Sequence, residues 1–128
     1  MHDPISDFFI RLKNAQHAGH TIVRIPYSRM SADLMRVLQS GGMIGAGEKR
    51  GKRARKILEV ALHSKNSSKF VRGVRLISTP GRKLYVPSRA LKSSRRGGMI
   101  LLSTSRGVMD MEQARRMKIG GLLIAEVW

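Results

Sequence analysis

The sequence predicts an α+β protein of two small domains, because its hydrophobic patterns change along the chain. Residues 1–66 alternate helical and strand patterns, whereas residues 67–128 contain mainly short apolar runs separated by turn residues. A polar stretch without periodicity, residues 64–68, separates them. We therefore expect an α/β domain at 1–66, with two helices packed on a three-stranded sheet. At 67–128 we expect a mostly antiparallel β domain with one short helix.

Two helices are expected in the first domain. Asp3 followed by Pro4 is typical of a helix cap with proline at the first helical position, and apolar residues then recur at helical spacing as far as Ala18. A second helix begins after the Ser28 cap and ends before the glycine pair at Gly41, a common C-terminal signal. The accompanying strands are expected at residues 21–25, from residue 43, and at 57–62, the last two joined by a basic, glycine-rich hairpin turn over 45–56.

The second domain is expected to consist mainly of antiparallel strands. Asp110 with Gln113 three positions later resembles a capping box, and it predicts the short helix, which runs to Met117. The expected strands are residues 70–77, 84–86, 99–102 and 122–128, with a turn at 79–81 and a Ser- and Arg-rich loop before residue 98.

Excess positive charge is the strongest functional signal in the sequence. The 25 Lys and Arg residues exceed the 8 Asp and Glu residues to give a net charge of +17, which repels itself unless a polyanion neutralises it. The charge is spread over both domains, and most of it is arginine, whose planar guanidinium pairs with phosphate and stacks on bases. Aromatic residues, at 5%, are too few for a sheet that stacks single-stranded bases. These observations favour a structured RNA partner.

The composition argues against metal, cofactor and membrane functions. Cysteine is absent and the 4 histidines are scattered, so we expect no disulfide, no metal site and no cofactor in an intracellular, reducing compartment. His17 and His20 lie close in sequence, but no nearby carboxylate completes a site, and we expect both at an exposed helix end. The apolar runs are far shorter than the ~20 residues of a membrane helix. Residues 1–4 are not typical of a secretory signal.

Two motifs suggest enzymes, and neither is complete. The glycine-rich segment 45–52 misses the Walker spacing, because Ala46 and Arg53 stand where glycine and a hydroxyl residue are needed, and it also misses the dinucleotide fingerprint. We interpret it as a hairpin turn that is either simply solvated or in nonspecific contact with phosphate. Ser103 and Ser105 lack the nucleophile elbow and have no histidine close in sequence, so a serine hydrolase is the least favoured of three interpretations.

A hydroxyl-rich segment at a strand end is the candidate RNA-binding loop. Hydroxyls, backbone amides, a glycine and an arginine together can contact ribose hydroxyls, base edges and phosphates. A hydroxyl-rich turn without a ligand is the plain alternative. Tyr85 is suited either to stack on RNA or to pack as a cross-strand partner, whereas Trp128 is expected in the core. The loop consists of Ser103, Thr104, Ser105, Arg106 and Gly107.

The order of motifs along nearly the whole chain resembles one known family. The first motifs are Arg11-Leu12-Lys13-Asn14-Ala15 in the opening helix, Ile25-Pro26-Tyr27-Ser28 at the first strand and cap, and Ser78-Thr79-Pro80-Gly81 before Tyr85-Val86. The most specific are Ser103 to Met109, then Ala114-Arg115, Gly120-Gly121 and the terminal Val127-Trp128. In this order and close to this spacing they resemble the family of the universal small-subunit ribosomal protein number eight.

The resemblance implies a non-enzymatic structural component of the small ribosomal subunit. It would bind small-subunit rRNA directly in the central domain and support assembly of the subunit. Its partners would be the rRNA and neighbouring small-subunit ribosomal proteins, in a cytoplasmic or an organellar ribosome. Neither a membrane nor a small-molecule substrate is expected. A free RNA-binding regulator or RNA chaperone is the alternative. Carried over by position, the main RNA-contacting loop is Ser103 to Gly107. Further contacts are expected at Tyr85, Gly120, Gly121, Lys118, Pro80 and Gly81, and in the first domain at Arg11, Asn14 and Ser28.

Three positions depart from the pattern of the family. Leu122 replaces the glutamate that usually follows the double glycine, Arg96 falls where a glycine-leucine-glycine turn normally begins, and Leu91-Lys92 replaces the usual leucine-proline. Loss of the glutamate would remove hydrogen bonds that orient the hydroxyl-rich loop. The basic residues of 49–56 and 95–96 would restore affinity through phosphates. We interpret the chain as a divergent member.

Overall fold

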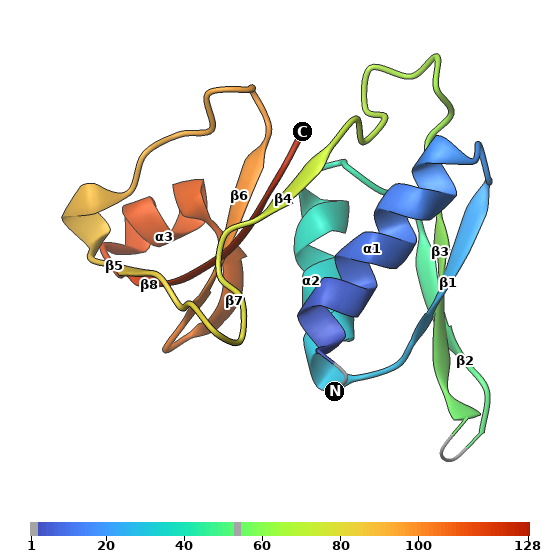
Figure 1. Ribbon diagram of the computed structural model, residues 1–128, viewed down its shortest axis with the longest axis horizontal. Coiled ribbons are helices and arrows are strands. Elements are labelled where there is room, and N and C mark those ends of the chain that lie inside the picture. Colours follow the sequence, from blue (N-terminus) through green and yellow to red (C-terminus); the bar gives the residue numbers. More distant parts are fainter. Residues whose placement is uncertain (1–2, 53–54) are drawn as a thin grey trace. The chain divides into compact units, whose positions relative to one another are not determined.

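The computed structural model describes residues 3–52 and 55–128, and the chain folds as two units, Met1–Arg72 and Gly73–Trp128 (Figure 1). The units divide after Arg72, whereas the sequence places a boundary near residue 66. Val71 accounts for this difference: its side chain is only 1% exposed, and its amide donates to the Gln16 side-chain oxygen at 3.1 Å. The segment after the polar stretch therefore remains attached to the first unit.

The N-terminal unit contains the two helices and the three-stranded sheet that the sequence predicts. Its core comes from Phe8, Phe9 and Leu12 on the first helix, Leu34 and Leu38 on the second, and alternate residues of the sheet. Asp3 accepts from the Ile5 amide and Ser28 forms a capping box with Ser31, so both predicted caps are confirmed. The elements are α1 (Pro4–His17), β1 (Ile22–Pro26), α2 (Arg29–Ser40), β2 (Gly47–Arg50) and β3 (Ile57–Ala61), and the antiparallel strand order is β1-β3-β2.

The prediction that a strand begins at Met43-Ile44 is wrong, because β2 begins only at Gly47. The Met43 amide donates to the Leu38 carbonyl and closes the end of α2. Ile44 is buried as a connection rather than as part of a ladder. Two buried apolar positions do not distinguish a strand from a packed connection. The tip of the following hairpin, including Arg53, lies outside the described residues.

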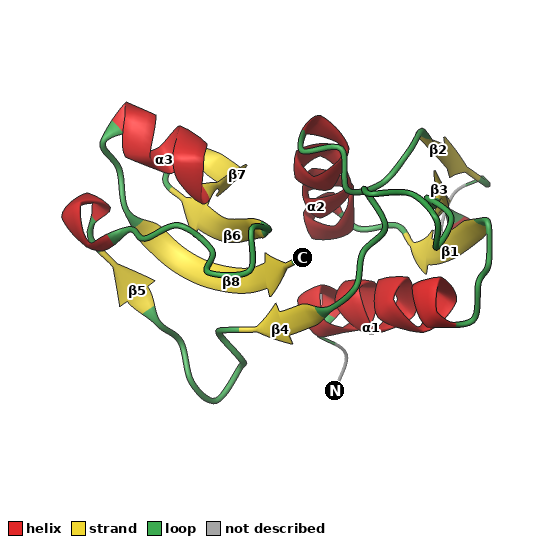
Figure 2. Ribbon diagram, turned by 90° about the horizontal axis from the view of Figure 1, so that it is seen from above, coloured by secondary structure: helices red, strands yellow, loops and turns green. Residues whose placement is uncertain are grey.

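The C-terminal unit is an antiparallel sheet with one short helix on one face (Figure 2). The helix begins as predicted, because the Asp110 side chain accepts from the Gln113 amide. Leu91, Leu102, Met109, Met111 and Ala114 form the core between helix and sheet. The strands are β4 (Val74–Leu76), β5 (Tyr85–Val86), β6 (Met99–Thr104), β7 (Gly107–Asp110) and β8 (Gly121–Val127), with the 3-10 helix η2 (Ser88–Ala90) and α3 (Met111–Met117). Their order is β4-β8-β6-β7, and β5 also pairs with β8.

Three details of this unit differ from the sequence prediction. β7 was not predicted, because four residues that begin with a glycine show no clear alternation. β4 is shorter than the predicted strand over 70–77. Trp128 is half-buried instead of part of the core, and the Arg96 guanidinium lies 4.3 Å from the centre of its ring. Within the described residues, no helix has the length and apolar character to cross a membrane.

Candidate nucleic-acid interface

The hydroxyl-rich segment, here called the hydroxyl turn (Ser103–Gly107), joins β6 to β7. The Thr104 hydroxyl donates to the Gly107 carbonyl oxygen at 2.8 Å and accepts the Arg106 amide at 3.1 Å. Gly107 has a φ of 103°, a left-handed conformation that favours glycine. Thr104 and Gly107 therefore shape the turn. In the described part of the chain the hydroxyls of Ser103 and Ser105 have no recorded hydrogen bond, so they are available to a ligand.

Strand register places the hydroxyl turn beside Tyr85. Tyr85 is opposite Leu122 across β5 and β8, and Leu122 is opposite Ser103 across β8 and β6. Ser103 is in turn opposite Val108 on β7. Side chains that face each other in an antiparallel sheet project to the same side. Tyr85, Leu122, Ser103 and Val108 thus form one line across four strands, here called the cross-strand row.

The cross-strand row lies on the sheet face that points away from α3. The next residue along each strand belongs to the core under α3 or packs against it: Val86, Leu123, Leu102 and Met109. Because side chains alternate between the two faces of a sheet, the row must face the other side. Tyr85 is 67% exposed. The sequence indicated Ser103 and Tyr85 separately, but only the register shows that Leu122 lies between them.

The double glycine lets three strands approach one another closely. A Cβ on Gly121 would collide with the Ser103 carbonyl oxygen of β6, and one on Gly120 would collide with the Val86 carbonyl oxygen of β5. Packing alone therefore requires glycine at both positions. Their contribution to the surface is to bring Ser103 and Tyr85 to either side of Leu122.

The other residues of this unit that were predicted to bind RNA, Pro80, Gly81 and Lys118, are exposed but lie outside the cross-strand row. Pro80 and Gly81 form the predicted turn, which is closed by paired hydrogen bonds between Thr79 and Arg82. This turn connects β4 to β5, on the side of β8 opposite β6 and β7. Lys118 ends α3 in the left-handed conformation with φ of 58° and exposes its side chain just before the double glycine.

The predicted N-terminal residues divide into exposed and structurally occupied groups. Arg11 and Asn14 are exposed on α1, and Arg11 forms an ion pair with Asp7 at 2.9 Å. The Ser28 hydroxyl accepts the Ser31 amide and donates to the Ser31 hydroxyl in the capping box of α2. Arg11 and Asn14 are one helical turn apart on the same side of α1 and can contact a ligand together.

All eight carboxylates of the chain are already used within the protein. Asp3 and Asp110 cap helices, and the other six form ion pairs with arginine, as Asp7 does with Arg11. The remaining lysines and arginines of the described residues consequently have no internal counter-charge. With these basic groups left without internal partners, the net charge of +17 attracts polyanions strongly.

Glu126 organises the loop where the sequence departs from the expected glycine-rich turn. Glu126 is only 3% exposed. It accepts from Ser94 at 2.6 Å and pairs with Arg75 and Arg96, each at 3.2 Å. The Ser94 hydrogen bond, followed by the two guanidinium groups, lowers the pKa of Glu126 below its ordinary value of 4.5 although burial opposes this. Arg96 is therefore paired within the protein although its side chain remains half exposed, whereas Arg95 has no ion pair in the described residues.

Glu126→Gln is expected to lower the free energy of unfolding by about 2 kcal/mol at neutral pH, because hydrogen bonds to a charged group are lost. The pKa of Glu126 is lower in the folded state, so this stabilisation is present above the ordinary pKa of 4.5 and disappears as pH falls through the folded-state pKa. Denaturant titrations across this pH range test it. Glu112→Gln, which breaks an exposed pair with Arg115, is the control and should change stability by about 0.5 kcal/mol or less. If the free energy of unfolding fell equally with pH in the parent protein and in Glu126→Gln, the stabilising role assigned to the Glu126 carboxylate would be contradicted.

Comparison with known proteins gives a consistent result over the full chain. A model of the family described as Ribosomal protein S8 matches residues 3–128. The chain is 38% identical over 127 residues to the small ribosomal subunit protein uS8 of Mycoplasmopsis agalactiae, covering 98% of this chain and 97% of that protein. It is 39% identical over 130 residues to the uS8 protein of Sorangium cellulosum, covering 100% and 99%. The chain belongs to the ribosomal protein S8 family.

Membership of the ribosomal protein S8 family decides between the interpretations of the hydroxyl turn. Members are structural, non-enzymatic ribosomal proteins, so the predicted absence of enzymatic activity is confirmed and the hydrolase interpretation of Ser103 and Ser105 is wrong. The resemblance on which the family was predicted is likewise confirmed. Its fold expectation agrees with the two helices on a three-stranded sheet and with the C-terminal sheet and its single short helix.

Proposed function

We propose that the chain binds small-subunit rRNA directly, in the central domain, and that this contact supports assembly of the subunit. The cross-strand row is the observation that carries the proposal. It places an exposed tyrosine and a partly exposed serine on either side of Leu122, next to the hydroxyl turn. The hydroxyl groups of Tyr85, Ser103 and Ser105 give this surface the polar groups that contact ribose hydroxyls and base edges in the shallow minor groove of an RNA helix.

Two kinds of force act together in the proposed complex. The uncompensated lysines and arginines attract phosphates at long range and release counterions, which depends strongly on salt but not on sequence. The hydroxyls of Ser103 and Ser105 contact ribose hydroxyls or base edges at short range, and Arg106, exposed in the same turn, contacts a phosphate. Tyr85 packs flat against a ribose or a base. Selectivity therefore comes from the row and most of the affinity comes from charge.

Other predicted contacts have supporting roles in this proposal. Lys118, directly before the double glycine, is placed to reach a phosphate beside the row, whereas Gly120 and Gly121 act by allowing the strands to approach. Pro80 and Gly81, in the turn between β4 and β5, and Arg11 and Asn14 on α1 are proposed as separate backbone contacts. Ser28 has no proposed role in RNA binding beyond its cap, because its hydroxyl is engaged with Ser31.

A salt series tests the proposal directly. Binding of the full chain to a fragment of the central domain is compared with binding to a scrambled duplex of equal length. Both RNAs should bind at low salt, because phosphate attraction is independent of sequence. The central-domain fragment should keep its advantage as the salt concentration rises, since hydroxyl and shape contacts are less sensitive to salt. If the advantage vanishes, the chain is held by charge alone, as expected for a general RNA chaperone.

Leu122→Glu is expected to raise the preference for the central-domain fragment about fivefold, because a carboxylate between Tyr85 and Ser103 can orient both side chains by hydrogen bonds of about 1 kcal/mol. The slope of log affinity against log salt concentration should change by less than the amount expected for about one phosphate contact. The same salt series measures both quantities. Leu122→Gln is the matched control for size without charge. An unchanged preference in Leu122→Glu would show that this position does not act on RNA recognition.

A further inference from the structure

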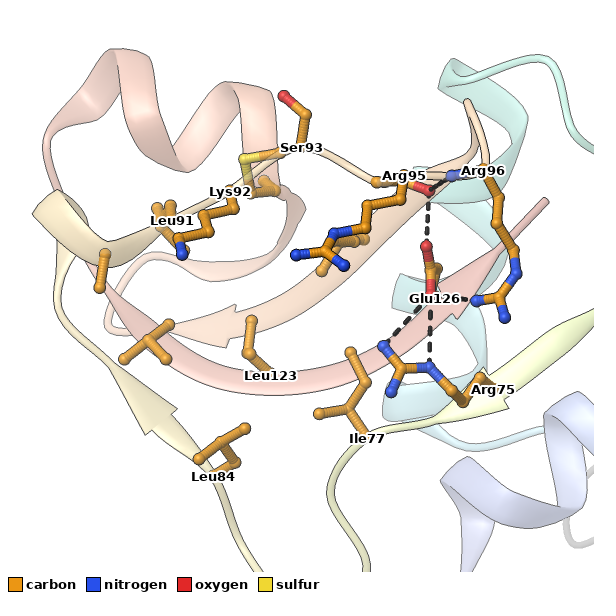
Figure 3. A pocket seen from close by; sticks show the side chains of 15 residues that line it. Arg75, Ile77, Leu84, Leu91, Lys92, Ser93, Arg95, Arg96, Leu123 and Glu126 are labelled. Atoms are coloured by element: carbon orange, nitrogen blue, oxygen red, sulfur yellow. Dashed lines mark hydrogen bonds and ion pairs between the residues drawn. The ribbon is translucent and has the colours of Figure 1, made fainter.

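A basic groove with an apolar floor lies on the face of the C-terminal sheet that carries α3 (Figure 3). Its cavity volume is about 640 Å³. The floor is formed by aliphatic side chains of the strands, chiefly Ile77, Leu84, Ile100 and Leu123, and η2 with the following loop forms one wall. Arginine and lysine side chains surround it. The groove is thus amphipathic, with an apolar floor and a positive rim.

The floor continues the core of the unit beyond the helix. Ile100, Leu123 and Val86 pack against the core cluster under α3 but remain only partly buried. Leu84 is 44% exposed. Apolar side chains that gather in one concave area, rather than being scattered singly, are typical of a contact site for another molecule. Covering this floor would complete the core of the unit.

The rim of the groove carries positive charge that no described carboxylate neutralises. Arg75 and Arg96 are held by Glu126, which is buried and fully engaged by these two residues and Ser94 (Figure 3). Lys92 and Arg95 also line the groove, and neither has an ion pair in the described residues. With four basic groups and one carboxylate, the rim selects a partner that carries negative charge beside an apolar anchor.

We propose that the groove binds an acidic segment of another protein, in which aliphatic side chains occupy the floor and flanking carboxylates pair with Arg95 and Lys92. RNA fits the groove less well, because its lining contains no aromatic side chain to stack on a base. Phosphates would meet the rim but would leave the aliphatic floor uncovered. Aliphatic side chains on the floor and carboxylates at the rim match both parts of the site.

The groove and the cross-strand row lie on opposite faces of the same sheet. Leu123, Val86 and Leu84 line the groove, whereas Leu122 and Tyr85, their neighbours in sequence, belong to the row. Both faces can therefore be occupied at the same time. Occupation of the groove goes beyond the proposed RNA contact and does not depend on it.

A synthetic peptide in which leucine and isoleucine alternate with glutamate is the probe for this site. Its affinity for the full chain is measured by fluorescence anisotropy, and amide chemical shifts locate its position. It should bind with shifts at Leu84, Ile100 and Leu123. Two further peptides, one with lysine in place of glutamate and one with serine in place of the apolar residues, should each bind at least about tenfold more weakly.

Two variants and a competition experiment decide the outcome. Arg95→Glu and Leu84→Ser should each weaken peptide binding about tenfold, while Arg116→Glu, a matched charge reversal on the exposed side of α3, should leave it unchanged. The central-domain RNA fragment should not displace the peptide. Displacement by RNA from the groove, equal binding of all three peptides, or equal losses in Arg95→Glu and Arg116→Glu would each overturn the proposal.

Discussion

Gly121→Ala is expected to lower the free energy of unfolding of the C-terminal unit by about 3 kcal/mol, the upper end of the usual effect of overpacking. The added methyl group would collide with the Ser103 carbonyl oxygen, which belongs to the β6 backbone and is not the movable end of a side chain. Relief requires β6 and β8 to separate, and these strands pair over most of their length. Denaturant titration followed by the fluorescence of Trp128, the 1 tryptophan in the chain, reports on this unit.

Gly81→Ala is the matched control for this experiment. A Cβ at Gly81 would meet no atom within 4 Å, and its φ is outside the left-handed region, so its effect should be within about 0.5 kcal/mol. If Gly121→Ala were as stable as Gly81→Ala and yet bound RNA poorly, the glycine would act at the RNA contact rather than through strand packing.

Replacement of both Ser103 and Ser105 by alanine is expected to weaken binding to the central-domain fragment about thirtyfold at moderate salt. Each hydroxyl contributes about 1 kcal/mol to the proposed contact, and the two together give this factor. Stability should change little, because neither hydroxyl has a recorded hydrogen bond in the described residues. Equilibrium binding titrations with the fragment and with the scrambled duplex measure the effect. Affinity for the duplex should hardly change, since phosphate contacts dominate it.

Ser88→Ala tests whether any hydroxyl of this unit would give the same result. Ser88 is partly buried in η2 and lies outside both the hydroxyl turn and the cross-strand row. Its replacement should leave both affinities unchanged. Equal losses for the fragment and the duplex in the double variant would show that Ser103 and Ser105 do not provide selectivity.

Local signals in the sequence predicted the helices well, because each depends on contacts a few residues apart. The caps at Asp3, Ser28 and Asp110 each act within the next three residues, and all three are present in the structure. Strands were harder to predict, since their partners are distant. Met43-Ile44 has the composition of a strand but closes a helix, and β7 is recognisable only through its pairing with β6.

The sequence by itself determined the class of the protein, the positions of its helices, its strong positive charge and the hydroxyl turn, because composition and short-range periodicity are local properties. Tertiary structure alone decided which of these residues act together. Register across β5, β8, β6 and β7 placed Tyr85, Leu122 and Ser103 in one row. The buried Glu126 pairs with Arg96 but not with Arg95, although both arginines line the groove. Pairing between strands distant in sequence sets these neighbours, and no local pattern records it.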